Sequence, residues 1–273
     1  MIKTRLYTSQ PLSVGATVVL ESTPSQHLVR VLRCRQGDRC LLFNGDGNEF
    51  EATVLSVGRN ATLAIGEQRF PKVESPFQVT LAQCVSRGEK MDYAIQKSVE
   101  CGVFSIVPIF SERCGVKLSK ERALKRQAHW QAVAVSACEQ SGRCVVPVVS
   151  EPVSLSDWLA RAEGVVFSAD TQHGFLSQYE KSELSSCSLL IGPEGGFSDN
   201  ERSLMQSHAC CGLYLGPRIL RTETAPVVAL SAAQTNKFVA SAQEGALAVV
   251  RIWDRVAALP LAILHHHHSV LLA

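Results

Sequence analysis

The chain lacks the short motifs by which the commonest cofactor and catalytic sites are recognised. Neither G-x-G-x-x-G after a first strand nor G-x-x-x-x-G-K-[ST] occurs, which argues against a Rossmann dinucleotide site and a P-loop nucleotide site. No serine nucleophile elbow and no His-Glu-x-x-His is present either. Any ligand site must therefore be built from less familiar elements.

Cysteine is abundant but is not spaced as a metal-binding framework. No two of the ten cysteines have Cys-x-x-Cys spacing, so a structural zinc site is not expected. Several cysteines lie in apolar runs, where a free thiol behaves as a small hydrophobe. The four histidines at 265–268 could bind stray metal, but we expect no functional metal there.

Long apolar segments are missing at both ends of the chain. The N-terminus lacks the apolar core of a secretory signal. The apolar tail around the four histidines is interrupted by Pro260 and is too short to span a membrane. We therefore expect a reduced, cytoplasmic protein with no membrane partner.

Charge of either sign is in little excess, because the formal net charge is only +2. Nucleic-acid binding would therefore depend on local patches rather than on global charge. One basic patch lies within residues 1–40, where a solvated basic face and an RNA-binding face are both compatible with the sequence. Its basic residues outnumber Glu21 and Asp38, and they are Lys3, Arg5, Arg30, Arg33, Arg35 and Arg39.

Residues 1–70 are typical of a small β-rich unit. Alternating strands at 40–43 and 49–57 flank the turn Asn-Gly-Asp-Gly at 44–47, which predicts a hairpin, and a further strand is expected at 61–65. A short helix is expected at 27–33, with Leu28, Val31 and Leu32 on one face and Arg30 and Arg33 toward the other. Residues 71–76 are predicted to be a linker.

From residue 77 the chain alternates between strand and helix patterns. Such alternation predicts an α/β fold with a mostly parallel sheet and helices on its faces. In a chain of 273 residues with 46% hydrophobic composition, a second domain of this kind has ample core. The expected strands lie at 79–85, 104–110 and 165–170, and the expected helices at 90–102, 120–141, 157–162 and 224–240.

Two glycine-proline turns near the end of this region are the most informative feature of the chain. They lie in SLLIGPEGGFSDNE (188–201) and LYLGPRILRTETAPVVAL (213–230), and each follows an apolar run, expected to supply one of the last two strands, and leads into a helix. Gly192, Gly195 and Gly196 leave backbone atoms accessible to a ligand. A capping box of Ser198 with Glu201 marks the start of the first helix. The two turns together predict one small-molecule site.

The combination of GPEGGFSDNE with LGPRILRTETA strongly resembles the 16S ribosomal RNA (uracil-N3)-methyltransferases, the RsmE family of the SPOUT class. Three other stretches are similar to that family: residues 27–38, 88–114 and 137–149. The resemblance covers about residues 27 to 235. The sequence departs from the family pattern at Ser86-Arg87, where proline and lysine are more usual, and at Cys101, where leucine is typical.

This resemblance implies a two-domain architecture. It implies a PUA-like RNA-binding β-barrel at 1–70 and a SPOUT domain with a mostly parallel, trefoil-knotted sheet at 77–242, the knot being formed by the loops at 190–197 and 213–225. Knotted chains are rare exceptions among known folds. Residues 243–273 extend past the matched region, and neither the resemblance nor the sequence assigns them a role.

The resemblance also implies a reaction. The chain is expected to transfer a methyl group from S-adenosylmethionine to N3 of a uridine in 16S ribosomal RNA, as a homodimer whose active site takes residues from both protomers. The target base would have to be unpaired or flipped to expose N3. Alternatives are a SPOUT methyltransferase with another target nucleotide, and a non-catalytic module that binds RNA or assists assembly.

Roles for single residues follow from the same resemblance. Glu223 is a candidate proton acceptor, with a helix-start carboxylate as its alternative, and Arg221 is a candidate stabiliser of the uracil anion, with a phosphate contact or ion pair as its alternatives. The expected RNA contacts are Arg5, Arg30, Arg33, Arg113 and Arg143, with structural ion pairs as the alternative for Arg113 and Arg143. The expected cofactor contacts are Leu190, Gly192, Pro193, Glu194, Gly195, Gly196, Leu215, Gly216, Arg218, Leu220 and Thr222.

Overall fold

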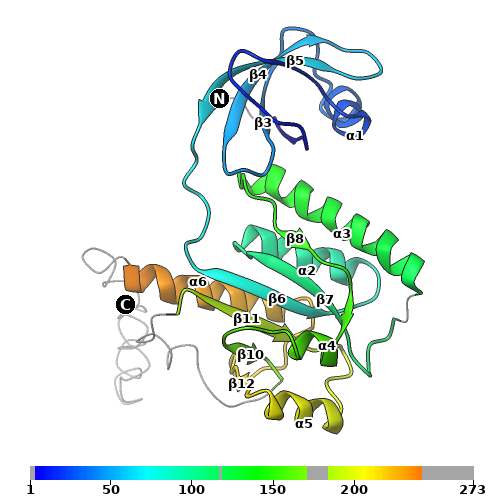
Figure 1. The fold of residues 1–273 in the computed structure, drawn as a ribbon, viewed down its shortest axis with the longest axis vertical. Coiled ribbons are helices and arrows are strands. Elements are labelled where there is room, and N and C mark those ends of the chain that lie inside the picture. The colour runs from blue at the N-terminus through cyan, green and yellow to red at the C-terminus, as the bar shows by residue number, and fades with distance from the viewer. Residues whose placement is uncertain (1–3, 117–118, 171–183, 242–273) are drawn as a thin grey trace, which may run out of the picture.

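The computed structural model describes residues 4–116, 119–170 and 184–241 (Figure 1). In these ranges the chain forms a five-stranded sheet near the N-terminus and a seven-stranded sheet that is flanked by helices. The predicted α/β class is therefore confirmed. The C-terminal residues 243–273, including the four histidines, lie outside the described residues.

The N-terminal sheet has the strand order β1-β3-β4-β5-β2. β1 runs parallel to β3, and the other pairs are antiparallel. The predicted hairpin at 44–47 is confirmed as the β3–β4 connection, where Gly45 and Gly47 both have positive φ. The strands are β1 (Arg5–Tyr7), β2 (Thr17–Val19), β3 (Arg39–Phe43), β4 (Glu49–Ser56) and β5 (Thr62–Arg69).

The helix predicted at 27–33 differs from the observed one. Helical structure begins earlier, with α1 (Ser22–Gln26), and continues as the wider π-helical segment η1 (His27–Val31). Leu28 is buried as predicted, but Val31 is 67% exposed and Leu32 is 36% exposed. The prediction of one apolar face is therefore wrong, because it assumed the α-helical repeat, whereas a π turn bonds residues five apart and rotates later side chains away.

The central sheet has the strand order β12-β10-β11-β6-β7-β8, with β9 also beside β7. Every strand pairing recorded for it is parallel. The expected strands at 79–85, 104–110 and 165–170 are confirmed, whereas the run at 213–215 follows a strand that already ends at residue 212. The strands are β6 (Gln78–Cys84), β7 (Ser105–Phe110), β8 (Val148–Val149), β9 (Val153–Ser154), β10 (Val166–Ser168), β11 (Ser186–Ile191) and β12 (Cys211–Gly212).

Two groups of helices cover the two faces of this sheet (Figure 1). α2 (Glu89–Glu100), α3 (Lys120–Ser141) and α6 (Ala225–Ser241) share one core with the sheet residues Leu81 and Leu189. α4 (Leu155–Leu159) and α5 (Asp199–Ser207) share the other core with Ala82 and Leu190. Neighbouring residues of one strand thus face opposite cores, as strand geometry requires.

The segment at 71–76 is bonded firmly to the central domain rather than being a free spacer. Glu74 accepts hydrogen bonds from the Arg143 guanidinium at 2.7 Å and from the amides of Cys144 and Val145. Ser75 is hydrogen-bonded to Gln234 of α6. The trefoil knot stays a prediction, since residues 171–183 between β10 and β11 lie outside the described part of the chain.

Candidate functional site

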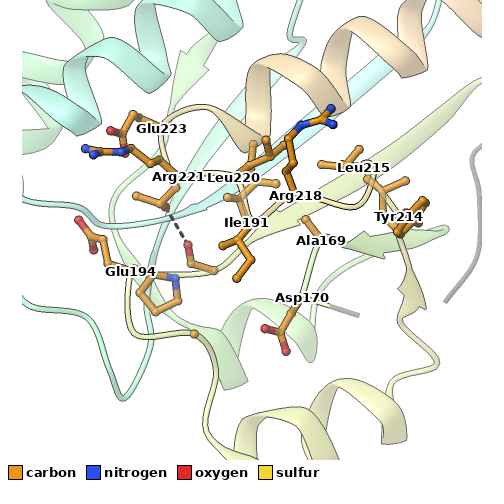
Figure 2. A pocket seen from close by; sticks show the side chains of 18 of the residues that line it. Ala169, Asp170, Ile191, Glu194, Tyr214, Leu215, Arg218, Leu220, Arg221 and Glu223 are labelled. Carbon is orange, nitrogen blue, oxygen red and sulfur yellow. Dashed lines mark hydrogen bonds between the residues drawn. The ribbon is translucent and has the colours of Figure 1, made fainter. Parts of the chain in front are cut away.

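A cavity of about 570 Å³ lies at the carboxyl ends of β10, β11 and β12. The lining comes from Lys90 and from the segments at the ends of these strands (Figure 2). These segments are 169–170, 191–196 without Gly195, and 213–225 without Thr224. Its size is that of a site for a small ligand. Ligands of parallel α/β sheets bind at this edge, because the loops after the strands converge there.

The two glycine-proline turns meet at this cavity. The Thr222 hydroxyl donates a hydrogen bond of 2.8 Å to the carbonyl oxygen of Gly192, which joins the second turn to the first. The fully buried side chain of Gln83, in β6, donates through Nε2 to the same hydroxyl at 3.1 Å. We call this chain of contacts the Gln83–Thr222–Gly192 link. It fixes the two loops relative to the central strand.

The glycines of the turns are required by their surroundings. A Cβ atom on Gly192 would lie 3.0 Å from Cε2 of Phe197, whose side chain is fully buried and has no room to move. Gly196 and Gly216 have φ of +64° and +97°, a region that side chains disfavour. The cavity wall is therefore backbone at these points, as the sequence predicted.

Glu194 and Arg113 lie at the rim of the cavity. Glu194 accepts a hydrogen bond of 3.1 Å from Lys90 at the start of α2. Partial burial raises the pKa of the Glu194 carboxyl, but a backbone hydrogen bond and the Lys90 ammonium outweigh this effect and leave the pKa below its ordinary value. Arg113 is exposed and donates to the carbonyl oxygen of Gly195 at 3.2 Å. The first glycine-proline turn is therefore flanked by the charged side chains of Lys90, Glu194 and Arg113.

Glu223 lines the cavity and has one carboxylate oxygen without a hydrogen bond in the described structure. Its Oε2 is buried and has no hydrogen-bond partner among the residues that the structure describes. Arg221 also lines the cavity, and its side chain is exposed. Figure 2 shows Glu223, Arg221 and Glu194 toward one end of the cavity and Tyr214, Leu215 and Arg218 toward the other. An unpaired buried carboxylate oxygen is costly, so this atom is available to a ligand donor.

Most residues expected to contact the cofactor line the cavity, but Leu190 and Gly195 do not. Leu190 faces the α4–α5 core, and its neighbour Ile191 lines the cavity instead. The Cβ position of Gly195 points at Arg113, 3.3 Å away. The lining does include Gly192, Pro193, Glu194, Gly196, Leu215, Gly216, Arg218, Leu220 and Thr222, and both Arg221 and Glu223.

Sequence reasoning missed several residues of the site. Gln83 is a polar residue inside an apolar strand, which was the available signal for it. Asp170 follows the last residue of β10 by two positions, at the carboxyl edge of the sheet, and accepts a hydrogen bond from Arg202 at 2.8 Å. Lys90 lies at a helix start and was distinguished by no pattern of its own.

The five arginines expected to contact RNA fall into two groups. Arg30, Arg33 and Arg113 are exposed. Arg5 and Arg143 are not available, and this part of the prediction is corrected.

Arg5 is 11% exposed and donates to Glu49 and to the carbonyl of Cys138. Arg143 is 7% exposed and pairs with Glu74. The Arg5 guanidinium joins β1 to the end of α3, and the Arg143 guanidinium joins the 71–76 segment to the central domain, since buried cations need such partners.

Two features are absent from the described ranges, a cluster of metal ligands and a helix that could span a membrane. In those ranges no group of three or more histidine, cysteine, aspartate or glutamate side chains could hold a metal ion. No helix there is both long and apolar enough for a membrane crossing.

Comparisons with known proteins agree with this architecture. A family model described as RNA methyltransferase domain matches residues 73–234, and one described as RNA methyltransferase PUA domain matches residues 25–64. Ribosomal RNA small subunit methyltransferase E of Buchnera aphidicola subsp. Schizaphis graminum is 33% identical over 235 residues, which is 84% of this chain and 95% of the relative. The enzyme of that name from Bacillus subtilis is 33% identical over 238 residues, covering 82% and 92% of the two chains.

A solved structure extends the likeness to the fold. The ribosomal RNA small subunit methyltransferase E from Neisseria gonorrhoeae, crystallised with S-adenosyl methionine, is 37% identical, with a TM-score of 0.78 over 85% of this chain and 97% of that one. The N-terminal sheet is accordingly PUA-like. With a sequence match over more than half its length, the chain belongs to the RNA methyltransferase family whose members include ribosomal RNA small subunit methyltransferase E.

Proposed function

We propose that this protein methylates N3 of a uridine in 16S ribosomal RNA of the small subunit, with S-adenosylmethionine as methyl donor. One observation carries the proposal: the two glycine-proline turns form a single cavity, in a chain whose relative was crystallised with that donor. The low net charge of +2 agrees with RNA binding through local patches rather than through the whole surface.

The cavity fits the proposed donor in size and in chemistry. Its wall at Gly192, Gly196 and Gly216 is bare backbone, which suits recognition of an adenine edge by main-chain groups. The residues that would hold the donor are those of the 191–196 and 213–223 loops. When bound, S-adenosylmethionine supplies a methyl group on an already activated sulfonium, so the protein's task is mainly to orient the acceptor.

Glu223 and Arg221 are proposed to act on the acceptor. The unpartnered Oε2 of Glu223 would accept the uracil N3 proton, and the exposed Arg221 guanidinium would stabilise the negative charge that develops on the base. A carboxylate that only served the start of α6 would be expected to have its oxygens bonded or solvated. The buried, unpaired oxygen therefore favours the proton-acceptor role.

The remaining parts of the proposal concern architecture. Residues 1–70 would form the RNA-binding domain, with Arg30 and Arg33 as exposed contacts, and residues 77–242 the knotted methyltransferase domain. The enzyme would act in the cytoplasm as a homodimer in which each cavity is completed by the partner subunit. Two-fold dimers are the commonest oligomers of soluble proteins.

Mass spectrometry of ribosomal RNA tests the proposed target. Nucleosides of 16S ribosomal RNA from a strain that lacks this gene should have lost 3-methyluridine, and a plasmid copy should restore it. If 3-methyluridine persists while another methylated nucleoside disappears, the target is a different nucleotide. If no nucleoside changes, the chain binds RNA without methylating it.

A further inference from the structure

One exposed face of α3 gathers positive charge that the cavity does not use. Four residues at helical spacing of three and four, which we call the α3 basic face, surround an open hollow of about 500 Å³, and no other described residue lines it. All four side chains are exposed, and α3 lies beside α2 in Figure 1. They are Arg122, Lys125, Arg126 and His129.

This arrangement is unfavourable for the helix by itself. Arg122 lies three and four residues before Lys125 and Arg126, so like charges adjoin along one face. α3 begins at residue 120, and a cation as close to its start as Arg122 opposes the helix dipole. Both features lower the stability of the helix, and a bound anion would offset both.

The charges of this face are poorly compensated within the chain. The guanidiniums of Arg122 and Arg126 make no ion pair with any residue in the described ranges. Lys125 pairs with Glu121 at 2.7 Å, but their side chains are 75% and 79% exposed to solvent. An ion pair this exposed contributes little to stability. The face therefore keeps most of its positive potential.

The α3 basic face is connected to the cavity by the first turn of α2. His129 Nε2 lies 2.9 Å from Oδ2 of Asp92, and Lys90, two residues earlier, lines the cavity and holds Glu194. Arg113 lies beside the 191–196 loop, where it donates a hydrogen bond to the carbonyl oxygen of Gly195. The first turn of α2 thus joins the cavity mouth to α3 through alternating basic and acidic side chains, Lys90 with Glu194 and His129 with Asp92.

We propose that the α3 basic face binds the phosphate backbone of the RNA segment that flanks the target nucleotide. The inference rests on the proposed RNA substrate and assigns it a second contact surface, apart from the N-terminal domain. Guanidiniums suit this role because their fork of donors matches the oxygens of a phosphate. A polyanion that spans the cavity mouth and α3 would neutralise the charges that the helix itself leaves unpaired.

The test compares two double variants with equal loss of charge. R122Q/R126Q removes both unpaired guanidiniums, and K72Q/R161Q removes two exposed cations outside the face and outside residues 1–70. Filter binding with radiolabelled, unmodified 16S ribosomal RNA gives Kd at several salt concentrations, and calorimetry with S-adenosylmethionine checks that each variant is folded. R122K/R126K keeps the charge and serves as the rescue.

We expect R122Q/R126Q to bind the RNA about tenfold more weakly, with the slope of log Kd against log salt reduced by about 1.5 for two lost phosphate contacts. K72Q/R161Q should stay within about twofold of the unsubstituted protein, and R122K/R126K should recover most of the loss. Affinity for S-adenosylmethionine should not change in any variant.

Two results would overturn the role of the α3 basic face: RNA binding by R122Q/R126Q within twofold of the parent, or an equal loss in K72Q/R161Q. If the parent binds RNA through this face but transfers no methyl group to uridine, the proposed reaction fails and the surface stands. If R122Q/R126Q binds and methylates normally, the surface fails and the proposed reaction stands.

Discussion

Glu223 is the residue on which the chemistry of the site depends most. Its buried Oε2 has no partner in the described part of the molecule, although it lies in a wall where hydrogen bonds satisfy neighbouring groups such as Thr222. Buried polar atoms are rarely left unpaired, and a bound ligand, an ordered water or a reaction accounts for such an atom. The proton-acceptor role proposed for Glu223 can be tested by a substitution that keeps its shape.

Glu223→Gln should lower kcat by about 10² or more, because an amide cannot accept the N3 proton. The KM for S-adenosylmethionine should stay within about threefold, since the side-chain volume is unchanged. Methyl transfer from tritiated donor to small ribosomal subunits measures both constants. Glu100→Gln, on the exposed end of α2, is the matched control and should be neutral. Normal turnover by the Glu223 variant would dismiss this residue as the proton acceptor.

Gly192→Ala should destabilise the protein by about 1–3 kcal/mol, because the new Cβ would lie 3.0 Å from the buried ring of Phe197. Affinity for the methyl donor should fall as well, since Gly192 forms part of the cavity wall. Chemical denaturation and calorimetry give the two values. Gly58→Ala is a suitable comparison, because its nearest contact would be 3.8 Å away and its φ is ordinary. Equal stability of the two variants would show that the first turn can relax.

At the scale of elements, the site depends on how three strand ends are joined. The Gln83–Thr222–Gly192 link connects β6 to the loops after β11 and β12 through hydrogen bonds of 3.1 and 2.8 Å. The Gln83 side chain is fully buried, and its Oε1 is already unpaired in the described structure. Without the Thr222 hydroxyl, the amide would keep only its Nε2 donations to the carbonyl oxygens of Cys84 at 3.2 Å and Thr222 at 3.4 Å.

Thr222→Val keeps the shape of the side chain and removes the hydroxyl. We expect a loss of about 1–3 kcal/mol in unfolding free energy and about tenfold weaker donor binding, because the two loops would no longer be fixed. Thr235→Val, whose hydroxyl bonds only to its own helix at Ser231, should change donor affinity by less than twofold. Equal donor affinities for the two variants would contradict the role of the link.

The elements of the central sheet were largely predictable from local patterns. Runs such as 79–85 and 104–110 are apolar and short, and the capping box at Ser198 and Glu201 fixed the start of α5. The sequence could not show that Ile191 rather than Leu190 lines the cavity. Successive residues of a strand face opposite sides of the sheet, so an error of one residue assigns the wrong side chain to the site. The π-helical segment at 27–31 was missed for a related reason, since its repeat differs from the expected one.

At the scale of the whole molecule, two buried arginines join distant segments of the chain. Sequence reasoning expected Arg5 to contact RNA and left an RNA contact or a structural ion pair open for Arg143, because a basic residue beside a binding motif has the same appearance whether it is buried or exposed. In the structure Arg143 donates to Glu74 at 2.7 Å and to the carbonyls of Val99 and Val103. Such contacts join segments far apart in the chain, so only the fold reveals them.

Arg143→Met should lower the unfolding free energy by about 2–4 kcal/mol, because it removes the buried guanidinium that bonds Oε2 of Glu74 and the carbonyls of Val99 and Val103. Urea denaturation followed by circular dichroism measures the loss. Lys125→Met breaks an exposed ion pair on α3 and should cost less than about 1 kcal/mol. A similar small cost for Arg143→Met would mean that the attachment of the 71–76 segment to the central domain does not depend on this cation.

The central claim is that the cavity and its loops direct a methyl group to N3 of a uridine in 16S ribosomal RNA. The most direct measurement incubates the purified protein with small ribosomal subunits from a strain lacking the gene and with methyl-deuterated S-adenosylmethionine. Nucleosides from the digested 16S RNA are then separated and weighed by mass spectrometry. The account predicts deuterated 3-methyluridine as the labelled product. Label in any other nucleoside, or in none, would contradict it.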